Sequence, residues 1–140
     1  MSLALCGALL LTALSPLPEV ASAAIRNDAG CRITRVIDGD TVAVRCPATG
    51  ADRLRLAGVD TPELSGRCAS ERLRAQMATQ RVRWLVITAG EVRVLPSGRR
   101  DRYGRLLGRV LVDGRPLGAG LVGAGHARPY AGGRRWSWCG

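Results

Sequence analysis

The sequence has no lysine and only one histidine, His126. It also has no C-x-x-C pair, although it contains five cysteines. Structural zinc sites are built from closely spaced cysteines or from cysteine and histidine together, so these absences argue against a zinc site. Because lysine is missing, all 21 basic residues are arginine. The positive charge of the chain is therefore carried by guanidinium groups.

Long hydrophobic runs are missing as well. The apolar stretch at residues 3–14 covers about twelve residues, too few to cross a hydrocarbon core of roughly 30 Å as a helix. It is followed by Ala21-Ser22-Ala23, a small-x-small pattern that a signal peptidase accepts. We expect a signal peptide at residues 1–23, cleavage near Ala23 and an N-terminal extension at 24–30, with an uncleaved membrane anchor as the alternative. The mature protein would be exported, periplasmic or secreted, without stable membrane association.

Length and composition indicate one folded domain. Of the 140 residues, 46% are apolar, which is too many for a disordered basic tail. The length excludes a multidomain enzyme and a membrane protein with several spans. The 21 arginines against 11 acidic residues give a formal net charge of +10. Such an excess is typical of proteins that bind nucleic acid or another polyanion, although a lysine-free, arginine-rich composition can also reflect coding bias.

Four cysteines remain after the expected cleavage: Cys31, Cys46, Cys68 and Cys139. An even number in a small exported domain predicts two disulfides, for which three pairings are possible. The first two cysteines bound a predicted β-hairpin, because β-branched residues are dense on both sides of Asp38-Gly39. With Asp38 and Gly39 as a two-residue loop, Cys31 faces Cys46 at a separation that suits a disulfide. By elimination, Cys68 would pair with Cys139.

The alternation within this hairpin predicts its buried face. Its apolar residues Ile33, Ile37, Val42 and Val44 would share one face. Arg35 falls on the same face, which indicates a bulge or a shifted register in the hairpin.

The rest of the chain is predicted to form three further strands and two helices. We expect strands at Arg53–Gly58, Glu91–Leu95 and Arg105–Val112, and helices at about Gly66–Val86 and Pro116–Gly125. This order favours a mainly β fold with two helices, a five-stranded Greek-key barrel of the oligonucleotide-binding (OB) type. The domain would span residues 31–130, followed by a tail at 131–140 that a disulfide ties to the body. Trp84 is expected in the core, and His126 is interpreted as structural.

Three separated clusters hold the residue types that phosphodiester hydrolysis needs. They are Asp38-Gly39-Asp40-Thr41, Arg55 with Asp60-Thr61-Pro62-Glu63, and Asp101-Arg102-Tyr103-Gly104-Arg105. Carboxylates can hold a hard cation or activate a water, and an arginine can bind a phosphate through two oxygens. Taken singly, each cluster also fits an ordinary turn, helix cap or solvated loop. Their combination in a basic protein favours hydrolysis of a polyanion.

The order of these motifs resembles the staphylococcal nuclease (thermonuclease) family. Between Arg32 and Tyr130, IDGDT is followed by RLRLAGVDTPE, by DRYGR with LGRVLVDG, and by LVGAGHARPY. The resemblance implies an OB barrel with helices packed on it. It also implies a calcium-dependent endonuclease that cleaves single-stranded or frayed DNA and RNA and leaves 3′-phosphates.

The resemblance further assigns metal and base roles. Asp40, Asp60 and the carbonyl oxygen of Thr61 would hold Ca²⁺. Two carboxylates and one carbonyl do not fill a calcium shell, which leaves positions for waters and a substrate phosphate. Glu63 would be the general base or would orient the attacking water.

Arginines and tyrosines would contact the substrate. By the same resemblance, Arg55 and Arg105 are the catalytic arginines, Tyr103 contacts nucleotide, and Tyr130 is a candidate for stacking on a base. Trp136 and Trp138 are also able to stack on bases, but contacts in the core or contacts that dock the tail are the preferred interpretation.

One alternative function comes from another class, a barrel that binds single-stranded nucleic acid without cutting it. A non-catalytic relative should have lost at least one of five residues, and all five are present: Asp40, Arg55, Asp60, Glu63 and Arg105. We therefore expect an enzyme, acting as a monomer, with DNA and RNA as substrates and Ca²⁺ as cofactor.

Overall fold

The structure, a computed structural model, describes residues 30–140. The predicted signal peptide at 1–23 lies outside the described residues, and so does the extension at 24–30 apart from Gly30. Within the described chain, no helix is long and apolar enough to span a membrane.

One six-stranded sheet forms the centre of the fold. Its strands run in the order β1-β2-β3-β6-β5, and β7 pairs with β6. The bounds are β1 Arg32–Val36, β2 Thr41–Cys46, β3 Gly50–Leu56, β5 Val92–Arg100, β6 Leu106–Val112 and β7 Arg115–Pro116. A second, two-stranded sheet pairs β4 (Val59–Asp60) with β8 (Arg128–Pro129). The remaining elements are the helices α2 (Ala69–Thr88) and α3 (Leu117–Gly123).

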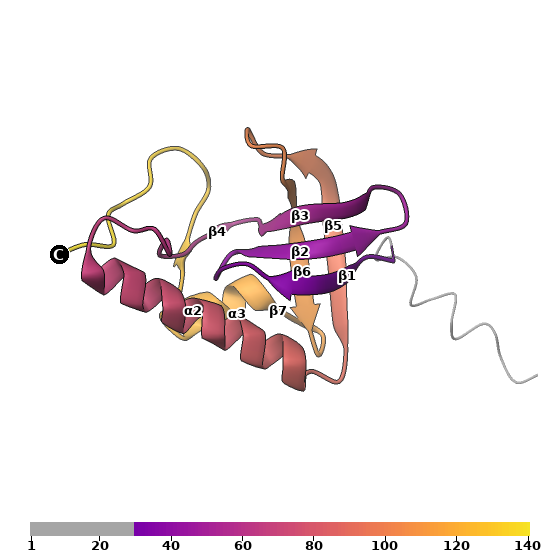
Figure 1. The fold of residues 1–140 in the computed structure, drawn as a ribbon, viewed down its shortest axis with the longest axis horizontal. Helices are drawn as coiled ribbons and strands as arrows, with labels where there is room; N and C mark the ends of the chain where they lie inside the picture. The colour runs from indigo at the N-terminus through magenta and orange to yellow at the C-terminus, as the bar shows by residue number, and fades with distance from the viewer. Residues whose placement is uncertain (1–29) are drawn as a thin grey trace, which may run out of the picture.

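The sheet is mixed and strongly curved. Strand β3 pairs with β6 in parallel, whereas the other pairings are antiparallel. Figure 1 shows β1–β3 crossing β5 and β6, with α2 along one side of the sheet. Among the described residues no ladder joins β1 to β5, so hydrogen bonds do not close the barrel. The mainly β, OB-like fold with two helices agrees with the expectation from the sequence.

The first hairpin has the predicted bulge but a different turn. Ile33 pairs with Val44, whereas Val36 pairs with Val42, so the register shifts by one residue between them. This shift reverses which side chains face inward, and Val36 is buried where Ile37 was expected. The two-residue loop is wrong: residues 37–40 form a longer connection in which Ile37 and Asp38 donate their N–H groups to the carbonyl of Thr41.

Helix α2 packs with a narrow face of small residues. Ala75, Ala78 and Val82 are fully buried at the spacing of one helical face. Trp84 lies two residues beyond Val82, about 200° around the helix, and it is 61% exposed. The expectation that Trp84 belongs to the core is therefore wrong.

Strand β5 runs further than its sequence suggested. It continues through Pro96 to Arg100, where the sequence predicted an end at Leu95. Proline is tolerated because β5 is an edge strand of the sheet and its missing N–H removes no ladder bond there. Its partner is Gly108, where a Cβ would lie 2.6 Å from the carbonyl oxygen of Leu95. A glycine at 108 thus allows the two strands to approach closely.

Two disulfides cross-link the described chain. Cys31–Cys46 closes the first hairpin, with Cα atoms 4.1 Å apart, and Cys68–Cys139 joins the start of α2 to the C-terminal tail, with Cα atoms 6.0 Å apart. In Figure 1 the tail arcs away from β8 and returns to the N-terminal end of α2. Residues 131–140 contain no helix or strand, yet this return brings them to the loop that follows β4.

Candidate active site

Two loops meet at the candidate site. The hairpin connection at residues 37–40 lies against the segment that follows β4, because a Cβ on Gly39 would be 3.3 Å from Thr61 and 3.0 Å from Ala78 of α2. A side chain at position 39 would crowd both Thr61 and Ala78. Asp40, Asp60 and Thr61 are buried beside this contact, with 5%, 3% and 1% of their surface exposed. The contact therefore brings together residues that are twenty positions apart in the chain.

Asp40 is held by a network of hydrogen bonds and one ion pair. Its Oδ1 accepts a 2.8 Å hydrogen bond from the Thr41 hydroxyl, and its Oδ2 lies 3.6 Å from Arg55 Nη2. Arg55 is itself buried and donates to the carbonyl oxygens of Leu56 and Val59, each at 3.1 Å. Since these bonds fix the guanidinium on β3, Arg55 presents a rigid positive charge beside Asp40.

Asp38 adds negative charge to the same loop. Its carboxylate accepts a hydrogen bond from the backbone N–H of Asp40. Burial, followed by repulsion from Asp40, raises the pKa of Asp38 to about 6, and the charge of Glu63 acts in the same direction. The carboxylates of Asp40 and Glu63 thus both lie within electrostatic reach of Asp38, and a bound cation would relieve this repulsion.

Arg105 reaches the network from the start of β6. Its Nη1 donates to the Thr41 hydroxyl at 3.2 Å, and its Nε donates to Asp101 Oδ2 at 2.7 Å. Burial raises the pKa of Asp101, but hydrogen bonds from Arg105 and Tyr103 outweigh it and hold the pKa below its usual value. The Tyr103 ring is 64% exposed and lies 5.5 Å from the Arg105 guanidinium. Arg102 also stacks on the ring at 4.9 Å and donates to its hydroxyl, so Tyr103 lies at the surface between two guanidinium groups.

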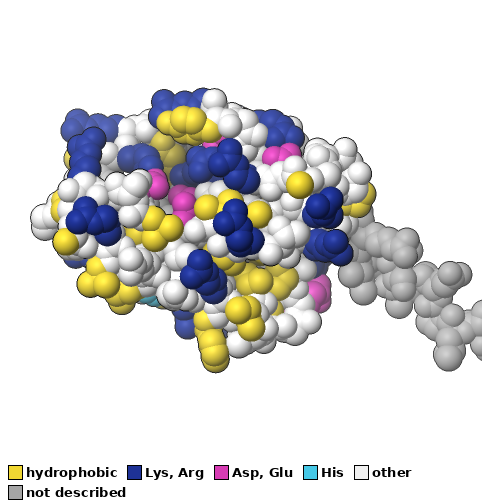
Figure 2. Space-filling view, viewed as in Figure 1, with side chains coloured by type: hydrophobic (Ala, Val, Ile, Leu, Met, Phe, Trp, Pro, Cys, Tyr) yellow, Lys and Arg dark blue, Asp and Glu magenta, His cyan; other side chains and the backbone are white. Residues whose placement is uncertain are grey.

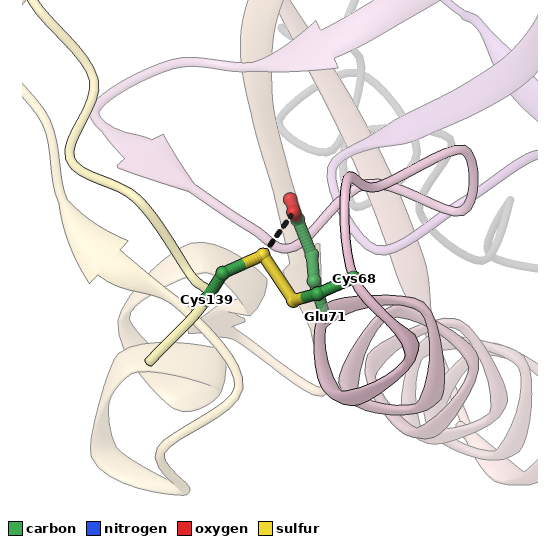
Figure 3. A group of neighbouring side chains, drawn as sticks. All are labelled: Cys68, Glu71 and Cys139. Carbon is green, nitrogen blue, oxygen red and sulfur yellow. Dashed lines mark hydrogen bonds between the residues drawn. A yellow bond between two sulfur atoms is a disulfide. The ribbon is translucent and has the colours of Figure 1, made fainter.

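Glu63 lies at the rim of the site. Its loop is fixed by hydrogen bonds to the Glu71 side chain. The side chain of Glu63 is 42% exposed. The buried Glu71 carboxylate accepts hydrogen bonds from the backbone N–H groups of Glu63 and Arg67, each at 3.2 Å. Glycine at position 66 leaves room for this carboxylate, since a Cβ there would lie 2.5 Å from Glu71 Cδ. Figure 3 shows the Cys68–Cys139 disulfide beside it, with Cys139 Sγ 3.5 Å from Glu71 Oε2.

The tail contributes a cation that the sequence did not lead us to expect. The guanidinium of Arg135 donates to Asp60 Oδ1 at 2.5 Å, to Glu63 Oε1 at 2.7 Å and to the carbonyl oxygen of Thr61 at 3.1 Å. Burial lowers the pKa of Arg135, but its bonds to Glu63 and Asp60 raise it more, so the pKa lies above its ordinary value. Arg135 therefore remains charged and contacts three of the predicted site residues.

The other tail contacts fix this position. Trp138 is buried, and its indole N–H donates to Asp60 Oδ2 at 3.1 Å. Tyr130 lies 5.7 Å from the Arg55 guanidinium, and its hydroxyl donates to the carbonyl oxygen of Gly133. Tyr130 thus lies beside Arg55, and its hydroxyl is engaged by the tail. The one sequence signal for Arg135 was Cys139: its expected pairing with Cys68 places the tail near the loop of Glu63.

The oxygen donors fit a hard divalent cation. Carboxylate oxygens and a backbone carbonyl are the ligands that Ca²⁺ prefers. The oxygens of Asp60 and Thr61 converge, since both accept from the single guanidinium of Arg135. Asp40 belongs to the other of the two loops in contact, the connection at residues 37–40, where the carboxylate of Asp38 is also near. This donor set is chemically suited to the predicted ion.

A groove and a basic surface surround the site. The groove, of about 570 Å³, runs from Glu63 past Arg67 to the tail residues Arg134, Trp136 and Trp138. Figure 2 shows arginine side chains scattered over one face of the molecule, with acidic side chains reaching the surface only in small patches between them. A ligand with repeated negative charge matches such a surface.

Comparison with known proteins points to the same family as the sequence motifs. Residues 53–135 match the family model described as staphylococcal nuclease homologue. A relative from Escherichia coli, described as an uncharacterized endonuclease, is 34% identical over 103 residues, or 71% of this chain and 60% of that protein. Two Bacillus subtilis relatives are endonuclease YncB, 36% identical over 98 residues (69% of this chain, 46% of the relative), and endonuclease YhcR, 30% identical over 105 residues (70% and 9%). The chain thus spans about 60% or less of these relatives. It belongs to the staphylococcal nuclease family.

Proposed function

We propose that this chain is a calcium-dependent endonuclease that hydrolyses phosphodiester bonds in single-stranded or frayed DNA and in RNA and leaves 3′-phosphates. The observation that carries the proposal is the contact between the connection at 37–40 and the loop of Thr61. Around this contact lie two buried aspartates, two arginines held by hydrogen bonds and the more exposed Glu63. Family membership and the names of the relatives support the same chemistry.

Asp40, Asp60 and the carbonyl oxygen of Thr61 would hold Ca²⁺. The bound ion would supply positive charge next to the scissile phosphate and help to position it. The burial of the two aspartates supports this role, because a buried carboxylate requires a cationic partner. In the described structure that partner is Arg55 for Asp40 and Arg135 for Asp60.

The arginines and Glu63 would perform the remaining chemistry. Arg55 and Arg105 would bind non-bridging phosphate oxygens, whose negative charge increases as water attacks phosphorus. Glu63 would take a proton from that water. The new P–O bond forms as the bond from phosphorus to the 5′ oxygen breaks, and the leaving oxygen takes a proton from solvent. The products are a 3′-phosphate and a 5′-hydroxyl.

The surroundings of the site fit a polymeric substrate. Tyr103 is exposed beside Arg105, where it is able to contact a nucleotide, and Tyr130 lies next to Arg55. Two disulfides support an exported, oxidising location. We also expect the protein to act as a monomer.

Cleavage assays test the proposal directly. The oxidised protein is incubated with single-stranded DNA and with RNA, first with Ca²⁺ and then with excess chelator. We expect cleavage with Ca²⁺ that stops on chelation, and fragment ends that polymerase extends only after phosphatase treatment. Persistent cleavage in chelator would refute the calcium requirement. Binding without cleavage under all conditions would favour the non-catalytic binding protein.

A single substitution tests the role of Glu63. Glu63→Gln should lower the cleavage rate by about 10²–10⁴-fold, because the amide cannot accept the proton of the attacking water. Glu91→Gln is the matched control, since that side chain is 59% exposed and contacts only Arg93 among the charged groups of the described chain. Equal rates for the Glu63 variant and the control would exclude Glu63 as the base.

A further inference from the structure

The tail arginine and the proposed metal ion require the same oxygens. Arg135 directs three N–H groups at Asp60, Thr61 and Glu63. Two of these acceptors are the proposed ligands on the β4 side of the site, and the third is the proposed base. A guanidinium and a divalent cation compete for the same oxygens, because their positive charges repel at that distance and each hydrogen bond from Arg135 occupies one of the acceptor positions that the ion would use.

Asp60 shows the conflict most directly. Its Oδ1 accepts from Arg135, and its Oδ2 accepts from the indole of Trp138. Both carboxylate oxygens are therefore engaged by the tail. Since Asp60 is 3% exposed, it has little surface left through which a cation can approach while the tail is docked.

The tail is held in place by contacts other than those of Arg135. Cys139, four residues later, is joined to Cys68 at the start of α2. Trp138 is buried, its ring lies 3.6 Å from the Arg128 guanidinium, and Arg128 donates to the carbonyl oxygen of Ser137 at 3.0 Å. A group tethered this closely acts at a high effective concentration. Arg135 thus competes with a cation from solution as an intramolecular ligand.

From these contacts we propose that Arg135 is the residue that sets the affinity of this site for divalent cations. Its guanidinium occupies the oxygens of Asp60 and Thr61 when no ion is bound, and the ion must displace it. The Cys68–Cys139 disulfide strengthens the competition by keeping the tail docked. The proposal rests on the proposed function, because it concerns the cation that the function requires.

A role of Arg135 in binding substrate phosphate is a different interpretation. The observed partners of Arg135 are two carboxylates and a carbonyl, which are ligands for a cation. The structure therefore favours competition with the metal. The two roles predict different changes in calcium affinity, which binding measurements separate.

Calorimetric titration with Ca²⁺, without substrate, tests the proposal. We expect the oxidised Arg135→Gln variant to bind Ca²⁺ at least about tenfold more tightly than the unmodified chain. Arg134→Gln is the matched control: it removes the same charge from the neighbouring residue, which stacks on Trp136 and contacts no carboxylate in the described chain. The control should change the affinity less than about twofold, and far-UV circular dichroism checks that each variant is folded.

A second arm tests the tether. In the Cys68→Ser/Cys139→Ser variant, studied at a temperature where it is folded, calcium affinity should also rise. Adding Arg135→Gln to it should give a smaller gain than the same substitution gives in the disulfide-bonded chain. This arm keeps the proposal testable if Arg135→Gln alone does not fold.

Three outcomes would overturn the proposal. Unchanged or weaker Ca²⁺ binding by Arg135→Gln excludes competition. Unchanged Ca²⁺ binding together with a raised KM for DNA assigns Arg135 to substrate phosphate and leaves the proposed function intact. If no variant binds Ca²⁺, the calcium requirement of the proposed function fails, and this inference fails with it.

Discussion

Several charged side chains of this protein hold a backbone loop in place through hydrogen bonds instead of pointing toward the candidate site. Glu71 is an example, because its buried carboxylate holds the N–H groups of Glu63 and Arg67. It also lies in the first turn of α2, where a negative charge interacts favourably with the helix dipole. The position of Glu63 therefore depends on a second glutamate eight residues later in the chain.

This dependence predicts the effect of removing the Glu71 carboxylate. Glu71→Ala leaves two backbone donors without their acceptor, so we expect the free energy of unfolding to fall by about 1–3 kcal/mol. Glu71→Gln keeps one acceptor oxygen and should lose less. Urea denaturation of both variants provides the measurement, and an alanine variant as stable as the unmodified chain would show that the loop does not depend on this carboxylate.

At the scale of single residues, the sequence predicted the motif residues but not the residues that bind or position them, Arg135 and Glu71. Asp40, Arg55 and Asp60 stood out in three separated clusters, and the family resemblance assigned their roles; the fold brings them around one contact between two loops. Arg135 was missed because its role depends on a tail without regular structure, whose path no local pattern encodes. Glu71 was missed as well: it follows Cys68 rather than a serine or threonine, so no capping box marks it, and its partners are the N–H groups of Glu63 and Arg67 in the preceding loop.

At the scale of elements, the first hairpin shows how tertiary contacts override local turn preference. Asp38-Gly39 favours a two-residue turn with positive φ at both positions, but Gly39 does not adopt positive φ. Gly39 packs against Ala78 and Thr61 instead, so the connection is longer. The bulge could be predicted, because Arg35 otherwise pointed into the core. The longer loop could not, since it depends on a helix far along the chain.

The two disulfides are predicted to differ in their effect on stability. A disulfide restricts the unfolded chain more when it closes a longer loop, and the sequence separations are 15 for Cys31–Cys46 and 71 for Cys68–Cys139. Replacing both cysteines by serine should therefore cost about 3 kcal/mol for the hairpin pair and about 4 kcal/mol for the tail pair. Chemical denaturation of the two double variants measures both values, and a larger loss for the hairpin pair would contradict the entropic argument.

At the scale of the whole molecule, two groups of charged residues stand out: arginines spread over the surface and several acidic residues gathered at the candidate site. The sequence carries 21 arginines against 11 acidic residues, and most arginines of the described chain lie on its surface. The acidic groups of the site are buried or lie at its rim, next to Arg55 and Arg135. A polyanion would thus be attracted by the surface as a whole, whereas the few buried groups would determine where it is cut.

The surface arginines therefore predict a salt-dependent affinity for single-stranded nucleic acid. Each neutralised phosphate contributes about −0.7 to the slope of log affinity against log salt concentration. A footprint of about five phosphates would give a slope of about −3.5, or roughly a 100-fold loss of affinity between 50 and 200 mM salt. Fluorescence anisotropy with the Glu63→Gln variant, which should bind without cutting, measures the slope.

An oligonucleotide of the same sequence with a neutral methylphosphonate backbone is the control and should bind weakly at every salt concentration. A flat slope for the charged oligonucleotide would mean that the arginine surface does not carry binding, and that recognition depends on the groove beside Glu63 instead.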